Sequence, residues 1–306
     1  MYDKDELGRL LDAALPAGRV LRDEPMSAHT TFRVGGPVDF LVDAHDADEV
    51  RAAVQAARAA GAPWHVIGCG SNVLVADAGL AGLVVKIGQS MADSRSDGTV
   101  VHAQAGATNE QVANAALAAG LAGYEFASGI PGSIGGAAIM DAGAYDGEFK
   151  DVGVSVTCLT PAGELREVPA AEADWGYRHS MMMDAGYIVL GAVLQLQPGD
   201  PAAIRAKMDD LAERRSSKQP LELPSAGSTF KRPTGYFAGK LIQDAGMRGH
   251  RAGGAMVSEK HCGFVVNAGG ATAADVLQVI RDVQAAVLAD AGVQLEPEVR
   301  MWGFEE

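Results

Sequence analysis

The sequence predicts an α+β protein that folds as more than one unit. The chain has 306 residues, more than one domain usually contains. Helix and strand signals alternate up to about residue 215. A segment rich in Ser, Pro, Gly and Lys then precedes a shorter stretch with its own strand and helix signals. We therefore expect an α+β region followed by a smaller α/β unit.

The first elements have clear boundaries. Asp46 is the expected N-cap of a helix over residues 46–60, which should end at Gly61. A Thr-x-x-Gln capping box at residues 108–111 opens a helix that should end at Gly120. Apolar, β-branched runs predict six strands, at residues 64–67, 73–75, 83–87, 152–159, 163–168 and 187–197.

The later elements follow the same reasoning. Asp200 and Pro201 should begin a helix that runs to about Arg215. Residues 216–236 have no periodicity and are expected to form a linker and loop. Beyond them Thr272 should cap a long amphipathic helix. The segments expected here are a strand over 262–266, the helix over about 272–290, and a closing strand over 293–299.

Composition excludes several classes of protein. Lys and Arg total 25 against 39 Asp and Glu, a net charge of −14, which disfavours nucleic acid as a partner. No apolar run is long enough to span a bilayer, and the polar start is unlike a signal peptide. The three cysteines are far apart and form no CxxC pair. We expect no membrane insertion, no bound metal and a cytoplasmic location.

Two glycine-rich segments, residues 68–72 and 128–140, are expected to form loops and are the main functional signal. Glycine lets the backbone approach a ligand closely, and successive backbone N–H groups bind phosphate well. Two such segments suggest a diphosphate held from both sides, although two tight structural turns are the alternative. The Rossmann fingerprint fails at Val73, where its third glycine and its helix are missing. Residues 235–240 fall short of a P-loop, and no metalloprotease or hydrolase motif is present.

Eight motifs occur in one order and cover nearly the whole chain from about residue 25. They lie at residues 30–36, 68–74, 128–136, 142–145, 177–180, 226–231, 253–257 and 295–299. This series resembles the UDP-N-acetylenolpyruvoylglucosamine reductases, flavoenzymes that make UDP-N-acetylmuramate for bacterial peptidoglycan. The short separation of Ser228 and Glu298 resembles the shorter form of the family. His29 and Asp141 depart from its pattern, because asparagine is usual at both positions.

The resemblance implies a two-part FAD-binding region of the PCMH/vanillyl-alcohol-oxidase type, which is not a Rossmann fold, and a smaller α/β substrate-binding domain. We expect FAD-binding subdomains over residues 1–88 and 89–215 and the substrate domain over 216–306. The implied reaction passes hydride from NADPH through FAD to C3 of UDP-N-acetylglucosamine enolpyruvate, with a proton added at C2. An FAD-dependent oxidase or dehydrogenase of an alcohol or sugar is the alternative enzyme. A non-catalytic nucleotide-binding regulator is the alternative of another class.

The resemblance also implies three catalytic residues. Arg178 would hold the substrate carboxylate, because guanidinium is permanently charged and matches a carboxylate. Ser228 would donate the proton, and Glu298 would act with Arg178 to polarise the enol carboxyl. Taken singly, these residues would be read as a surface ion pair, a turn residue and a solvated glutamate.

The same resemblance implies the binding residues. The cofactor set comes from the glycine-rich segments and the motif that follows them: Gly68, Cys69, Gly70, Ser71, Asn72, Ser128, Gly129, Gly132, Ser133, Gly135, Gly136, Ala142 and Gly143. The substrate set is Lys218, Lys231, Arg232 and His261. Arg214 is a further candidate for the substrate diphosphate; a solvated helix end is the alternative for Arg214 and Arg215, and a structural role is the alternative for His261.

Overall fold

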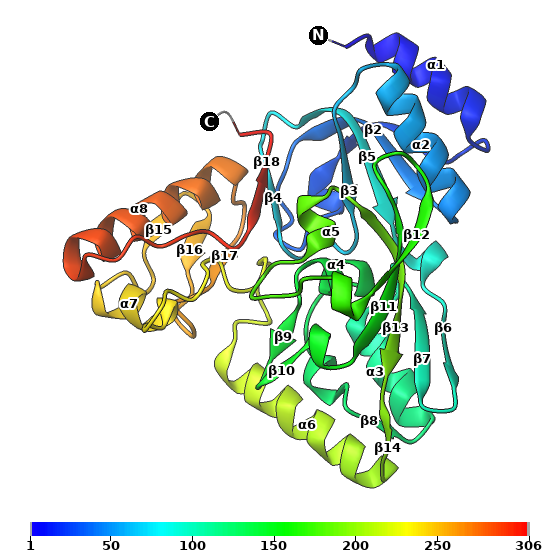
Figure 1. Cartoon of the computed structure of the whole chain (residues 1–306). Helices are drawn as coiled ribbons and strands as arrows, with labels where there is room; N and C mark the ends of the chain where they lie inside the picture. The colour runs from blue at the N-terminus through cyan, green and yellow to red at the C-terminus, as the bar shows by residue number, and fades with distance from the viewer. Residues whose placement is uncertain (1, 305–306) are drawn as a thin grey trace. The chain divides into compact units, whose positions relative to one another are not determined.

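The computed structural model describes residues 2–304, and the chain divides into two compact units (Figure 1). Each unit is assembled from three stretches of chain. Unit 1 comprises Met1–Leu21, Phe40–Cys69 and Gly82–Arg215, and unit 2 comprises Arg22–Asp39, Gly70–Ala81 and Ser216–Glu306. The expected division at residues 88 and 215 remains a prediction.

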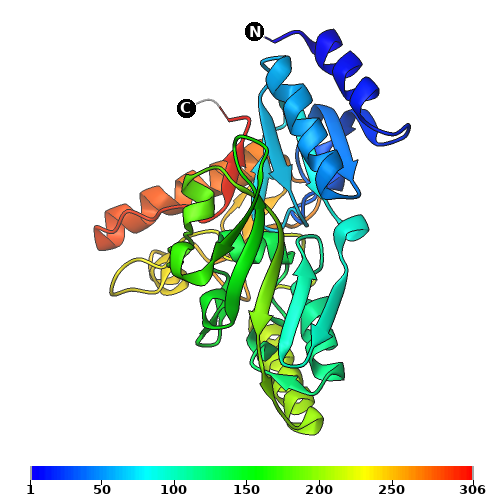
Figure 2. The same cartoon turned by 45° about the vertical axis from the view of Figure 1, so that its right-hand side comes forward.

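One sheet, most of whose residues belong to unit 1, has four strands in the order β1 (Val20–Pro25), β2 (Pro37–Ala44), β5 (Leu80–Ile87) and β3 (Trp64–Ile67). Strands β3 and β5 are parallel. Helices α1 (Lys4–Ala14) and α2 (Ala47–Ala59) lie next to each other (Figure 2). Asp46 caps α2 by accepting the Glu49 N–H at 2.8 Å, as expected. Because β3 leads into a turn and then a strand, the arrangement is not a Rossmann βα unit.

The second sheet of unit 1 is antiparallel. Its order is β12 (Leu165–Pro169), β11 (Gly153–Leu159), β13 (Ile188–Gln195), β7 (Val100–Gln104) and β6 (Ser94–Asp97). Its helices are α3 (Asn109–Ala118), α4 (Ile134–Ile139), α5 (Met181–Asp184) and most of α6 (Pro201–Lys218). The capping box of α3 between Thr108 and Gln111 is present, as expected. Short pairs complete the unit: β8 (Leu121–Ala122) with β14 (Gln197–Pro198), and β9 (Gly143–Ala144) with β10 (Gly147–Glu148).

Unit 2 has a three-stranded antiparallel sheet of β15 (Arg251–Ala252), β16 (Ala255–Val257) and β17 (Val265–Asn267). Helix α8 (Ala273–Ala291) packs on it, with α7 (Ala238–Asp244) beside the helix (Figure 1). The predicted capping box of Thr272 and Asp275 begins α8. Strand β18 (Arg300–Trp302) pairs in parallel with β4 (Val73–Val75).

The two units have separate hydrophobic cores. The core of unit 2 draws Phe32, Val34 and Leu74 from the two early stretches of chain and packs them with residues of the late stretch, such as Val279 and Ile280 of α8. Each unit is therefore built from stretches of chain that are separated in the sequence.

The structure corrects four of the predicted segments. The closing strand expected over 293–299 begins at Arg300, so Glu298 precedes the strand. The strand expected over 262–266 is β17, which starts at Val265. Helix α6 continues to Lys218, inside the expected linker. The glycine-rich segment 128–140 contains the short helix α4 and is not loop throughout.

Candidate functional site

The first glycine turn follows β3 and is tightly packed. A Cβ atom at Gly68 would lie 2.4 Å from the Ser133 Oγ, so this turn and the second glycine-rich segment meet here within unit 1. Gly70, in unit 2, has φ 62°, and a Cβ there would lie 2.0 Å from the carbonyl oxygen of His29. The backbone contact and the left-handed φ therefore require glycine at Gly70, whereas a side chain at Gly68 would displace the Ser133 side chain.

Cys69 lies between these two glycines and is partly buried. Burial raises the pKa of its thiol, while nearby Lys86 and a hydrogen bond with Ser133 partly oppose that rise. A thiol of raised pKa is mostly protonated at neutral pH, so Cys69 is poorly suited to act as a nucleophile.

The second glycine-rich segment is held by the backbone of its neighbours. The N–H of Ile134 donates to the Ala107 carbonyl at 2.8 Å, and that of Gly135 donates to Ala105 at 2.9 Å. The Ser128 N–H and hydroxyl both bond the Glu125 carbonyl. The main-chain N–H groups of these three residues are thus used within the fold. A phosphate would have to bind other N–H groups of the segment.

Asn109, the first residue of α3, is a supporting residue that sequence reasoning missed. It is buried, its N–H donates to the Gly132 carbonyl at 3.1 Å, and its Oδ1 accepts the Tyr124 hydroxyl at 2.8 Å. Burial raises the pKa of Tyr124, so this phenol stays protonated and can donate. No local pattern marks such a pair, because its members lie in different elements.

Arg178 lies at the tip of a two-residue turn between Gly176 and His179, whose N–H and C=O groups bond each other. Its φ is 57°, in the left-handed region that residues other than glycine rarely adopt. Its guanidinium lies 5.0 Å from the centre of the Tyr177 ring. Strain of this kind is often retained where a side chain must be aimed for function.

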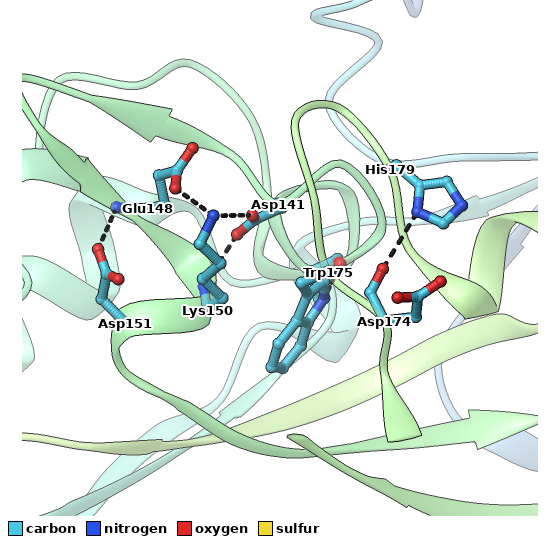
Figure 3. A network of polar contacts seen from close by, with 8 residues as sticks. Asp141, Glu148, Lys150, Asp151, Asp174, Trp175 and His179 are labelled. Carbon is cyan, nitrogen blue, oxygen red and sulfur yellow. Dashed lines mark hydrogen bonds and ion pairs between the residues drawn. The ribbon is translucent and has the colours of Figure 1, made fainter. Parts of the chain in front are cut away.

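Two hydrogen bonds tie this turn to α4. The Trp175 Nε1 donates to the Ala138 carbonyl at 2.8 Å, and the Ser180 Oγ donates to the Ile139 carbonyl at 2.8 Å. His179 adds contacts to the Asp174 carbonyl and the Asp184 carboxylate. Figure 3 shows Trp175, Asp174 and His179 in this arrangement. The turn that carries Arg178 is therefore fixed against the end of the second glycine-rich segment.

Asp141, a departure from the family pattern, is the buried member of an ionic cluster with Lys150 and Glu148 (Figure 3). Its side chain is fully buried, and its Oδ1 accepts the Lys150 N–H at 2.9 Å. Its Oδ2 lies 3.4 Å from the Lys150 ammonium, which also pairs with Glu148. Burial raises the pKa of Asp141, and Lys150 opposes the rise only in part. The carboxyl group is therefore occupied by its own hairpin.

His29, the other departure, is paired as well. Its Nε2 lies 2.9 Å from a Glu24 carboxylate oxygen, and both side chains are mostly buried. Its carbonyl is the atom that Gly70 approaches. The structure thus gives His29 a role in supporting the first glycine turn.

Ser228 and Glu298 lie in neighbouring segments of unit 2. The Glu298 N–H donates to the Thr229 carbonyl at 2.8 Å, and an isolated bridge joins Phe230 to Pro297. Ser228 is exposed, whereas Thr229 is buried and accepts the Val265 N–H on its Oγ1 at 2.9 Å. This alternation points the Ser228 side chain away from the core. The structure therefore brings Ser228 and Glu298 together, while Arg178 belongs to the other unit.

The predicted substrate residues are all in unit 2. Lys231 pairs with Glu296 at 3.1 Å on the surface. The Arg232 guanidinium lies 4.0 Å from the centre of the Phe237 ring, and its Nε donates to the Tyr236 carbonyl at 3.3 Å. Lys218 is exposed at the end of α6. Three cations on this unit can thus reach solvent and an anion.

His261 has a structural contact of its own. Its Nδ1 accepts the Gly263 N–H at 3.1 Å, and its ring meets Phe264 edge to face at 5.1 Å. Burial lowers its pKa, and Arg248 lowers it further. A neutral ring whose Nδ1 is an acceptor leaves the Nε2 hydrogen as its one donor for a ligand.

Arg215 and Tyr145 are further candidate site residues, to which the sequence analysis assigned no role. A Cβ at Gly129 would lie 2.9 Å from the Arg215 Nε, and the guanidinium lies 5.7 Å from the Tyr145 ring. Arg214, by contrast, forms an exposed pair with Asp210. The adjacent arginines at 214 and 215 were visible in the sequence. Only their positions on the helix show that Arg215 points toward Gly129 and Arg214 toward solvent.

Two absences concern only the part of the chain that the structure describes. Across residues 2–304, no helix is both long and apolar enough to cross a membrane. No group of three or more His, Cys, Asp or Glu side chains within that range is placed to hold a metal ion.

Family models match two parts of the chain. Residues 38–169 match the FAD binding domain, and residues 219–302 match the C-terminal domain of UDP-N-acetylenolpyruvoylglucosamine reductase. The expected fold, an FAD-binding region followed by the C-terminal domain of this reductase family, is thereby confirmed.

Curated relatives and a solved structure match almost the whole chain. The UDP-N-acetylenolpyruvoylglucosamine reductase of Agathobacter rectalis is 52% identical over 301 residues, covering 94% of this chain and 96% of the relative. That of Clostridium perfringens strain SM101 is 50% identical, covering 92% of both chains. The crystal structure of the enzyme from Thermus caldophilus superposes with a TM-score of 0.79 at 33% identity, covering 92% of this chain and 98% of that one.

Proposed function

Because the chain belongs to the UDP-N-acetylenolpyruvoylglucosamine reductase family, we propose that it reduces UDP-N-acetylglucosamine enolpyruvate to UDP-N-acetylmuramate with NADPH. The observation that carries this proposal is the 52% identity to a reductase of that name over 94% of the chain. We propose that the reaction serves peptidoglycan synthesis in the cytoplasm.

The residues of the glycine-rich segments fit FAD. At Gly68 and Gly129 an added Cβ would strike the neighbouring Ser133 and Arg215 side chains, so these segments keep the backbone bare and close to polar groups. We assign the diphosphate to N–H groups of Gly129, Gly132, Ser133 and Gly136, and we assign Gly68, Cys69, Gly70 and Ser71 of the first glycine turn to FAD as well. Ser128 and Gly135 shape the second glycine-rich segment, and Ala142 and Gly143 follow it in the chain. When bound, FAD carries hydride from NADPH to the substrate.

Arg178 and Glu298 are assigned to the substrate carboxyl group. Hydride arrival at C3 leaves negative charge on C2 and the adjoining carboxylate, and a fixed guanidinium lowers the energy of that charge. The anchored turn and left-handed backbone of Arg178 support this assignment, because they hold the side chain before substrate arrives.

Ser228 is assigned as the proton donor to C2. Its hydroxyl is exposed, and its backbone is fixed on the core side by the buried Thr229. An isolated serine is a weak acid, so positive charge must stabilise the alkoxide that remains. Lys231 lies three residues further on and is our candidate for that charge. Lys218 and Arg232, with His261, are assigned to the substrate's UDP portion.

An absorption spectrum tests the proposed function. The purified protein should be yellow, lose its flavin absorbance when NADPH is added without oxygen, and regain it when UDP-N-acetylglucosamine enolpyruvate follows. Folded protein that binds no flavin would contradict the FAD assignment. Fast recolouring by oxygen, together with indifference to the enolpyruvyl substrate, would instead indicate an oxidase.

A further inference from the structure

Glu125 is a buried carboxylate that lies three residues before the second glycine-rich segment. Its side chain is 4% exposed. Both of its carboxylate oxygens accept the Gly123 N–H, at 3.1 and 3.2 Å, and its Oε2 lies 3.3 Å from the Lys207 ammonium. Burying a carboxylate is costly unless the group is paired and hydrogen-bonded. The fold therefore meets this cost with a backbone donor and a cation.

The main chain of Glu125 holds the first residue of the segment. Its carbonyl oxygen accepts the Ser128 N–H at 3.2 Å and the Ser128 hydroxyl at 2.8 Å. Gly129, which we assign to the FAD diphosphate, follows at once. Glu125 begins the short 3-10 helix η3 (Glu125–Ala127). Its side chain thus fixes the start of η3, and its carbonyl fixes the point where the FAD segment begins.

Helix α6 contacts this part of the chain at two points within unit 1. Lys207 pairs with Glu125, and a Cβ atom at Gly129 would lie 2.9 Å from the Arg215 Nε. Leu211, midway between the two cations, is buried. Residues four positions apart on a helix share one face, so these three side chains form a single stripe along α6. The same helix face therefore contacts both Glu125 and the FAD segment.

We propose that Glu125 and Lys207 are positioning residues for FAD, and that their ion pair holds the second glycine-rich segment in its binding conformation before the cofactor arrives. This inference rests on the proposed function, because it takes that segment to bind the FAD diphosphate. A segment that is already ordered loses less conformational entropy on binding, so it binds its ligand more tightly. Neither side chain is assigned a contact with FAD itself.

Titration of the flavin-free protein with FAD tests this inference. For Lys207→Met, which leaves the buried carboxylate without this cation, the Kd for FAD should rise about tenfold. Glu125→Gln keeps an oxygen acceptor for the Gly123 N–H but loses the ion pair, so its Kd should rise by a similar factor. Lys207→Arg restores the charge and should stay within about twofold of the unsubstituted Kd.

Arg205→Met is the matched control. Arg205 is an exposed cation on α6, two residues before Lys207, and its substitution changes the net charge by the same amount. The Kd of this variant should be unchanged. The double variant Glu125→Gln/Lys207→Met should raise the Kd no further than the weaker-binding single variant, because both substitutions remove one shared interaction.

A kinetic measurement separates positioning from general damage to the fold. At saturating FAD, both half-reactions of Lys207→Met should run within about twofold of the unsubstituted rates, since the ion pair acts on cofactor binding. Slowing of both half-reactions in fully loaded protein would indicate a purely structural role and overturn the inference. Lys207 has a side chain that is 60% exposed, so its variants remain informative if Glu125→Gln fails to fold.

Three further results would contradict the inference. These are an unchanged Kd in Lys207→Met, an equal rise in Arg205→Met, and effects that multiply in the double variant. Failure of the proposed function is distinguishable, because the unsubstituted flavin-free protein would then bind no FAD at all.

Discussion

Asp141 shows how one residue can carry a cost that its neighbours only partly offset. The carboxyl group is fully buried, and Lys150 provides its one charged partner among the contacts in Figure 3. Burial holds its folded-state pKa above the unfolded value. A raised pKa means that the group contributes stability when protonated in both states, and that this contribution is lost as the pH rises through the folded-state pKa.

Asp141→Asn should therefore stabilise the fold at pH 8 by about 1 kcal/mol, because the amide keeps an acceptor for the Lys150 N–H without a buried charge. The gain should shrink as the pH falls and the Asp141 carboxyl group becomes protonated in the folded protein. Urea unfolding at pH 8 and at acidic pH measures it. Asp151→Asn, an exposed carboxyl of the same hairpin, is the control and should change little. A destabilised Asp141→Asn at pH 8 would show that the ion pair outweighs the burial.

Ser228 is the residue whose proposed role is most directly measurable. Ser228→Ala should leave flavin reduction by NADPH unchanged and slow reoxidation by substrate by about a thousandfold, because only the second step needs the proton. Stopped-flow absorbance follows both steps. Thr229, next in sequence, is buried and bonds Val265, so Thr229→Ser preserves that bond and serves as the control. Equal losses in the two steps would exclude a dedicated proton donor.

At the scale of elements, helix α8 begins on a distant side chain. The Asp77 carboxylate accepts the N–H groups of Ala273 and Ala274, both at 2.8 Å. These are the first two residues of α8, whose N–H groups have no partner within the helix. Asp77 thus joins the turn after β4 to the helix that covers the sheet of unit 2.

Asp77→Ala should lower the free energy of unfolding by about 1–2 kcal/mol, since two donors lose a charged acceptor. Urea denaturation provides the measurement. Asp244→Ala removes an exposed carboxylate paired with Lys240 on α7 and should cost less than about 0.5 kcal/mol. If both substitutions lower the free energy of unfolding equally, the cap at α8 stabilises the fold no more than an exposed ion pair does.

At the scale of the whole molecule, each unit depends on stretches of chain that lie far apart. Residues 216–306 contain most of unit 2 but lack Phe32 and Leu74, which are fully buried in its core. They also lack β4, the partner of β18, and Asp77, the cap of α8. Losing each large core side chain costs about 3–5 kcal/mol, against a total stability of about 5–15 kcal/mol.

A fragment of residues 216–306 should therefore not fold cooperatively by itself. Its one tryptophan, Trp302, reports on this through fluorescence during urea unfolding. The full chain should unfold in a sigmoidal transition, whereas the fragment should change gradually. A sigmoidal transition in the fragment would show that the early stretches are dispensable.

Signals that act within a few residues were predicted well. The caps at Asp46, Thr108 and Thr272 were recognised because a side chain and the N–H that it accepts are three residues apart. The closing strand was misplaced, because β18 is defined by pairing with β4. The sequence predicted the residue types and motifs of the candidate site. It did not predict that Gly68 approaches Ser133, because no pattern of neighbouring residues marks that contact.

By itself, the sequence determined that the chain is not a Rossmann protein, where its main helices begin, and which family its ordered motifs resemble. Only the tertiary structure decided that Asn72 reaches Glu298, that Asp77 caps α8, and that three stretches share one core. The physical reason is the separation in sequence between the residues that interact. Propensity and capping depend on neighbours in the chain, whereas these contacts depend on the path of the whole backbone.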